Sequence, residues 1–123
     1  ALFNPASGEW YVWLSSMNYT GTGPQTFFYP DYTSPAPGDY DGDRTTDPAL
    51  FNAAEGMWYV WLSSANYAAS GPHAFAQSGY ALPAAGDWDG DGLADPGVFD
   101  PALGSWYVWL SASAYARFGP VAF

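Results

Sequence analysis

The chain has 123 residues and a formal net charge of −10 with only two basic residues, so it lacks the basic surface that binds nucleic acid or an anionic membrane. It contains no cysteine, which excludes disulfides and thiolate metal sites, and its apolar runs are too short for membrane insertion. Aromatic residues make up 20% of the chain beside 14 glycines and 11 prolines, which favours an all-β protein with a packed core and many turns.

An internal repeat of 48 residues organises the chain. The motif Trp-Tyr-Val-Trp-Leu-Ser at residues 10–15 recurs at 58–63 and at 106–111, with the same offset both times. The sequence therefore predicts about two and a half tandem repeats. They are a partial repeat over 1–37 that lacks its aspartate loop, a complete repeat over 38–85, and a nearly complete repeat over 86–123.

The complete repeat shows the order of the predicted elements. They are an aspartate-rich loop (38–48), a short apolar strand (49–51), a turn at Gly56, a strong strand (58–63), turn signals at 66–67 and 71–72, a third strand (73–76) and a weaker fourth strand (80–83). Three or four short strands separated by glycine and proline predict a blade-like antiparallel β-sheet of the β-propeller type.

The strand over 58–62 carries large apolar side chains at every position. Successive side chains on a strand point to opposite faces of the sheet, so both faces of this strand need cover. We expect neighbouring sheets to stack, with Trp58 and Trp61 in a continuous aromatic core. The alternative is that these tryptophans form an exposed platform on which sugars stack.

Two loops place aspartates at alternate positions and end on a fourth aspartate. Carboxylates at the first, third and fifth positions of a curled loop converge on one point, and a backbone carbonyl at the seventh and a carboxylate at the ninth complete an oxygen cage. Such all-oxygen ligands favour calcium over zinc or magnesium, whereas turns alone do not require four aspartates at one spacing twice. The predicted ligands of two calcium ions are Asp39, Asp41, Asp43, the carbonyl of Thr45 and Asp47, and Asp87, Asp89, Asp91, the carbonyl of Leu93 and Asp95.

These loops, followed by Ala-Leu-Phe (49–51) or Gly-Val-Phe (97–99) and then Gly-x-Trp-Tyr, resemble the FG-GAP/VCBS repeats of integrin-α propellers and bacterial surface proteins. The resemblance covers essentially the whole chain. It implies propeller blades, calcium bound for stability, and an extracellular or cell-surface location. The family usually has glycine after the third aspartate, as at Gly92, but the first loop has Arg44. We expect strain at this arginine if its φ is positive.

Catalysis is not expected, because the chain has one histidine and neither lysine nor cysteine. We expect a calcium-stabilised structural protein that assembles through stacked blades, as a homo-oligomer, a filament or part of a longer repeat array in an extracellular fibre or surface layer. The alternative is a carbohydrate- or protein-binding propeller module of the lectin or adhesin type, with Tyr40, Trp88, Tyr29 and Tyr32 as contact residues. Asn18, in an Asn-Tyr-Thr sequon, is a candidate glycosylation site.

Overall fold

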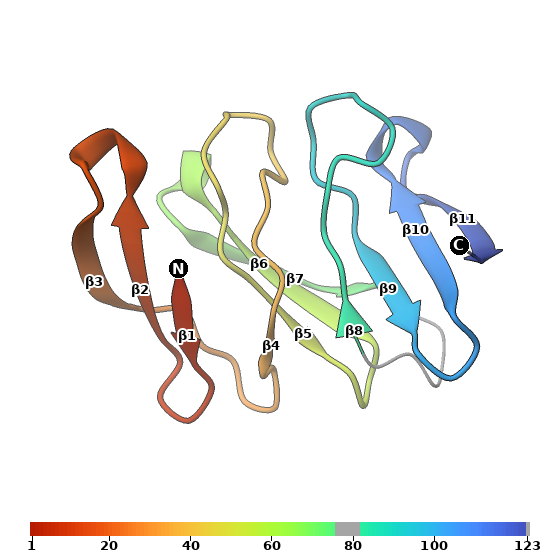
Figure 1. Ribbon diagram of the computed structural model, residues 1–123, viewed down its shortest axis with the longest axis horizontal. Helices are drawn as coiled ribbons and strands as arrows, with labels where there is room; N and C mark the ends of the chain where they lie inside the picture. Colours follow the sequence, from red (N-terminus) through yellow and green to blue (C-terminus); the bar gives the residue numbers. More distant parts are fainter. Residues whose placement is uncertain (76–81, 123) are drawn as a thin grey trace.

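The computed structural model describes residues 1–75 and 82–122, which form three antiparallel β-sheets with no α-helix among them (Figure 1). The sheets contain β1 (Leu2–Asn4), β2 (Glu9–Leu14) and β3 (Thr20–Thr26); β4 (Ser34–Pro35), β5 (Ala49–Asn52), β6 (Met57–Leu62) and β7 (Ala68–Ala74); and β8 (Leu82–Pro83), β9 (Gly97–Asp100), β10 (Ser105–Leu110) and β11 (Ala116–Ala122). The prediction of an all-β, antiparallel fold is confirmed. None of the helical turns in the described ranges has the length and apolar character needed to cross a lipid bilayer.

Each sheet is a meander, in which every strand pairs with its neighbours in chain order. A short 3₁₀ turn follows β2, β6 and β10: η1 (Ser15–Met17), η2 (Ser63–Ala65) and η3 (Ser111–Ser113). The short strands β4 and β8 precede the predicted repeat boundaries at 38 and 86, yet they pair with β5 and β9 beyond the aspartate loops. The first strand of each four-stranded sheet therefore precedes the aspartate loop in the chain, and the other three strands follow it.

The strand predicted third in the complete repeat corresponds to β7, the last strand of the middle sheet, and it begins earlier than predicted. β7 already includes Gly71 and Pro72, which the sequence analysis expected in a turn before the strand. The register between β6 and β7 shifts opposite these two residues, so they lie in a β-bulge within the sheet. The predicted strand residues 76 and 80–81 lie outside the described residues.

Aromatic side chains fill the spaces between neighbouring sheets. The cluster between the first and second sheets contains Trp10, Tyr32, Leu50, Tyr59 and Trp61, and the cluster between the second and third contains Ala36, Phe51, Trp58, Val98, Tyr107 and Trp109. Trp58 and Tyr59 belong to opposite clusters because adjacent side chains on a strand point to opposite faces. Both Trp58 and Trp61 are buried, and the expectation that stacked sheets cover both faces of β6 is confirmed.

Candidate metal centres

The two aspartate loops connect the first and second strands of the four-stranded sheets. One lies between β4 and β5 and the other between β8 and β9, and both lie at the same end of the molecule, at the top of Figure 1. An antiparallel bridge closes each loop, between Gly38 and Asp47 and between Gly86 and Asp95. The bridges bring the two ends of each four-aspartate motif together.

In the first loop, carboxylate oxygens of Asp39, Asp41 and Asp43 lie within 4.8 Å of one another. Backbone amides further along the loop hold these side chains in place. Asp39 accepts a hydrogen bond from the N–H of Arg44 at 2.9 Å, and Asp43 accepts one from the N–H of Thr45 at 2.7 Å. Aspartate commonly bonds nearby backbone amides in tight turns, and here the effect is to curl the loop around its own carboxylates.

In the second loop, the three carboxylates that lie within 4.8 Å of one another belong to Asp87, Asp89 and Asp95. Asp91 lies outside this group, and one of its oxygens accepts a hydrogen bond from the hydroxyl of Ser111 at 2.9 Å. Its other oxygen accepts the N–H of Leu93 at 2.8 Å. The two loops therefore share one sequence pattern but gather different sets of three aspartates.

The last aspartate of each motif is fully buried. The carboxylate of Asp47 accepts one hydrogen bond from the N–H of Tyr40 at 2.9 Å and another from the N–H of Ser63 at 2.8 Å. Asp95 accepts the equivalent pair in the next repeat, at 2.8 and 2.7 Å. Asp47 and Asp95 thus connect each loop by a hydrogen bond to the 3₁₀ turn after β6 or β10. The sequence analysis did not predict this role.

Serines in that turn also donate hydrogen bonds to other aspartates of the loop. The hydroxyl of Ser63 donates to Asp43 at 3.0 Å, and the hydroxyl of Ser64 donates to Asp41 at 2.6 Å. The hydrogen bond from Ser64 is the main reason that the pKa of Asp41 is lowered, because it favours the charged carboxylate. In the third sheet Ala112 replaces Ser64, so Asp89 lacks this partner. The Leu-Ser pair that recurs at the end of β2, β6 and β10 was the sequence signal available for these contacts.

Arg44 adopts the left-handed backbone conformation that the sequence analysis considered. Its φ is 69°, and Gly92 at the equivalent position of the second loop has a φ of 93°. Both residues donate their N–H to the first aspartate of the loop, at 2.9 and 3.0 Å. A side chain with a Cβ atom in this region costs about 1 kcal/mol, so the first loop carries backbone strain that the second does not.

The donor set suits a hard divalent cation. Each cluster offers only carboxylate oxygens, the ligands that calcium prefers, and neither contains the nitrogen or sulfur ligands favoured by zinc. Thr45 and Leu93 lie at matching points of the two loops, where each donates its N–H to the preceding aspartate. A bound calcium ion would supply the positive charge that offsets repulsion among the clustered carboxylates.

The two loops also touch each other. The N–H of Ala94 donates to the carbonyl of Asp39 at 2.6 Å, and the side chain of Leu93 lies against Gly42. The backbone of the second loop is therefore hydrogen-bonded to the first residue of the aspartate motif in the first loop.

The four aromatic residues predicted as ligand contacts do not form one surface. Tyr32 is buried and packs edge-on against Tyr29, which stacks on Tyr59 with ring centroids 4.1 Å apart. Tyr29 and Trp88 are exposed. They pack on different sheets, because Tyr29 stacks on Tyr59 of β6 and the ring of Trp88 lies 5.6 Å from that of Trp106 in β10.

Tyr40 is half-buried, and its hydroxyl donates to the carbonyl of Ala36 at 2.7 Å. Burial, together with the nearby carboxylate of Asp47, raises the pKa of this tyrosine strongly. Asn18 is exposed and follows η1 in the left-handed conformation, with a φ of 50°. An exposed turn is compatible with a glycosylation site, which stays a prediction.

The two aspartate clusters stand as candidate metal centres on their own geometry. No protein family, curated protein or solved structure matches the chain. The resemblance to FG-GAP/VCBS repeats therefore stays a prediction drawn from the motifs.

Proposed function

We propose that the chain is a non-catalytic structural repeat protein, stabilised by calcium, that acts in an extracellular or cell-surface assembly. Its sheets would be propeller-type blades that stack on further blades. The observation that supports this proposal best is the position of the two aspartate clusters. Each cluster belongs to a loop in which Asp47 or Asp95 accepts a hydrogen bond from the 3₁₀ turn after β6 or β10.

Calcium would act on the packing of the sheets through this connection. Without a counter-ion, the repulsion among three carboxylates opposes the curled loop and the hydrogen bonds that fasten it to the sheet. An ion that binds only the folded loop stabilises the whole chain by mass action. Extracellular calcium modules commonly have dissociation constants of about 10⁻⁴ to 10⁻³ M, which suits exposed loops such as these.

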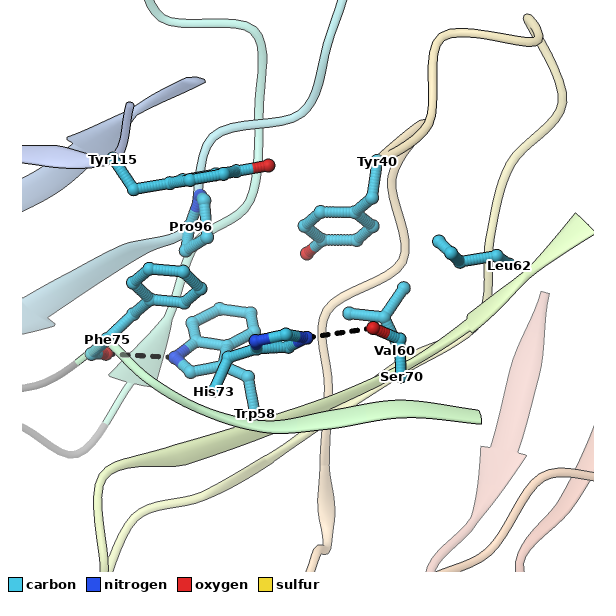
Figure 2. Close-up of a pocket in the computed structure, with 9 residues that line it drawn as sticks. All are labelled: Tyr40, Trp58, Val60, Leu62, Ser70, His73, Phe75, Pro96 and Tyr115. Carbon is cyan, nitrogen blue, oxygen red and sulfur yellow. Dashed lines mark hydrogen bonds between the residues drawn. The ribbon is translucent and has the colours of Figure 1, made fainter. Parts of the chain in front are cut away.

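The side chains of a type used in catalysis are better explained by a structural role. The imidazole of His73 is hydrogen-bonded to the hydroxyl of Ser70 at 2.9 Å, a pairing that resembles a nucleophile with its base (Figure 2). Within the described ranges, however, no carboxylate bonds this imidazole, so the third group that orients such a base is missing. The equivalent pairs in the other repeats are Thr22 with Gln25 and Phe118 with Val121, which cannot act in this way.

The alternative function, a ligand-binding module, is best supported by a cavity in the same region. A cavity of about 250 Å³ lies between the second and third sheets, with Tyr40, Tyr115 and Phe75 around it and with the His73–Ser70 pair at one side (Figure 2). Aromatic walls with a few polar groups are typical of small-molecule sites. We prefer the structural function because the metal-binding pattern is repeated in two loops, whereas this polar pair occurs once.

Thermal unfolding with and without calcium tests the proposal. The unfolding temperature should rise by on the order of 10 °C for each occupied loop when calcium exceeds the dissociation constant about 100-fold, since that excess is worth about 2.7 kcal/mol per site. Magnesium at the same concentration should give a smaller rise, because it dehydrates reluctantly. Circular dichroism would follow the transition in calcium, magnesium and chelator.

Asp89→Asn separates ion binding from a general loss of stability. Only one oxygen of Asp89 accepts a backbone amide, the N–H of Asp91 at 3.2 Å, and asparagine keeps that acceptor while it removes one charge. The variant should therefore lose part of the calcium-dependent rise and unfold no earlier than the parent in chelator. Asp31→Asn removes the same charge outside the loops and should keep the full rise. Equal unfolding temperatures of the parent in calcium and in chelator would contradict the proposal.

A further inference from the structure

The chain forms the same junction between neighbouring sheets twice. Between the first and second sheets, the ring of Phe27 lies 5.8 Å from that of Trp61 and 5.2 Å from that of Tyr67. Between the second and third sheets, the equivalent rings of Phe75, Trp109 and Tyr115 are separated by 6.0 and 5.1 Å. Each junction thus joins one defined face of a sheet to the opposite face of the next sheet.

The first sheet presents one half of this junction to solvent. Trp13 is 44% exposed, whereas the equivalent Trp61 and Trp109 are 8% and 7% exposed beneath the preceding sheet. Leu2 is 65% exposed, although the equivalent Leu50 and Val98 are fully buried. We call this outer side of β1 and β2 the leading face. It carries the residue types that the other two sheets bury, but none of the sheets in the described part of the chain lies against it.

The third sheet presents the other half. An open apolar pocket of about 280 Å³ on its outer side is lined by Trp88, Trp106, Val108, Leu110, Phe118 and Val121. These positions match Tyr40, Trp58, Val60, Leu62, Ser70 and His73, which line the cavity between the second and third sheets. In that inner cavity, Pro96 and Tyr115 of the following sheet form the opposite wall (Figure 2). We call the outer side of β10 and β11 the trailing face.

The trailing face is more apolar than its covered counterpart. Phe118 and Val121 stand where the middle sheet has Ser70 and His73, and Phe118 is 56% exposed. A repeat that ends an array in water ordinarily carries polar residues on its outer side. Apolar residues on a face that is open in the single chain indicate that this face is buried when the protein functions.

We infer that the leading face of one copy of this chain docks on the trailing face of a second copy and continues the junction already formed twice within the chain. A second copy fits because the two faces are the two halves of one existing interface. Tyr19 of the incoming copy would take the place that Tyr115 holds beside the inner cavity. This inference rests on the proposed structural function and adds its interface, direction and partner. Such head-to-tail contacts build a closed ring or a filament.

Two variants that each block one face test the direction of docking. Leu2→Glu places a charge on the leading face, and Phe118→Glu places one on the trailing face. In calcium-containing buffer, the parent should self-associate as its concentration rises, and each variant alone should associate at least about 30-fold more weakly, the effect of losing one strong interface residue. An equimolar mixture of the variants should form a complex of two chains that grows no further, because one intact face remains on each partner. Sedimentation velocity would measure the parent, each variant and the mixture.

Leu103→Glu is the matched control. It makes the same type of substitution at a residue that is 69% exposed in the hairpin between β9 and β10 and does not line the pocket of the trailing face, and it should associate like the parent. A parent that stays monomeric at every concentration would overturn the inference. So would a Leu2→Glu variant that pairs with itself as well as the parent does, since that result indicates contact between like faces. Calcium-dependent thermal stabilisation, measured on the same samples, shows separately whether the proposed role of the loops holds.

Discussion

The first loop uses its aspartates for two different tasks. The carboxylates of Asp39, Asp41 and Asp43 gather in one place, whereas Asp47 is buried and accepts hydrogen bonds from the backbone amides of Tyr40 and Ser63. The spacing of the aspartates predicted that carboxylates gather in each loop, but it did not predict which three, since Asp47 lies outside the first group and Asp91 outside the second. The sequence could not show that Asp47 also serves as an anchor, because its partner Ser63 is sixteen residues away and reaches it only once the sheet has formed.

The strain at Arg44 leads to a prediction at the residue scale. Replacing Arg44 by glycine should raise the free energy of unfolding by about 0.5–1 kcal/mol, because glycine adopts a positive φ freely and this gain exceeds the greater entropy of glycine in the unfolded chain. Chemical denaturation in the presence of chelator would measure the change without a contribution from bound ions.

The reciprocal substitution Gly92→Arg is the control for this prediction. Gly92 has a φ of 93°, and a Cβ atom there would meet nothing within 4 Å, so only the backbone would be strained. The variant should lose stability by a similar amount. If Arg44→Gly lowers stability, the arginine side chain makes a favourable contribution larger than the backbone strain.

At the scale of the elements, runs of apolar residues and turn signals predicted the two central strands of the middle sheet well. The strand expected at 49–51 is β5, and the strand expected at 58–63 is β6 to within one residue at each end. The third strand was misplaced because glycine followed by proline usually marks a turn, whereas Gly71 and Pro72 form a bulge that stays inside the sheet. Only the register against β6 distinguishes these two outcomes.

The bulge gives a prediction for Gly71→Ala. Gly71 has a φ of 136°, and a Cβ atom there would lie 2.7 Å from the carbonyl oxygen of Trp58, in the backbone of the paired strand. The substitution should destabilise the chain by about 2 kcal/mol more than Gly104→Ala, which also has a positive φ but no atom within 4 Å of the added Cβ. Thermal or chemical unfolding of both variants measures the difference. Equal losses of stability in the two variants would show that the bulge accommodates the added Cβ atom without a further loss.

At the scale of the whole molecule, stacking and the aspartate loops act together. Apolar residues at every position of β6 predicted that both faces would be covered, and Trp58 and Tyr59 lie in separate clusters on its two sides. The contact between the two loops, through Ala94 and Asp39, could not be predicted because it depends on how the second and third sheets are placed. Ions bound in adjacent loops would therefore stabilise the same sheet junction that the aromatic core forms.

The number of calcium ions bound by the folded chain tests this account most directly. Equilibrium dialysis in millimolar calcium, followed by metal analysis and circular dichroism, should give two ions per chain. A variant that combines Asp87→Asn with Asp89→Asn should stay folded and bind one. A folded parent that binds no calcium, or a double variant that still binds two ions, would contradict the assignment of the two aspartate clusters as calcium centres.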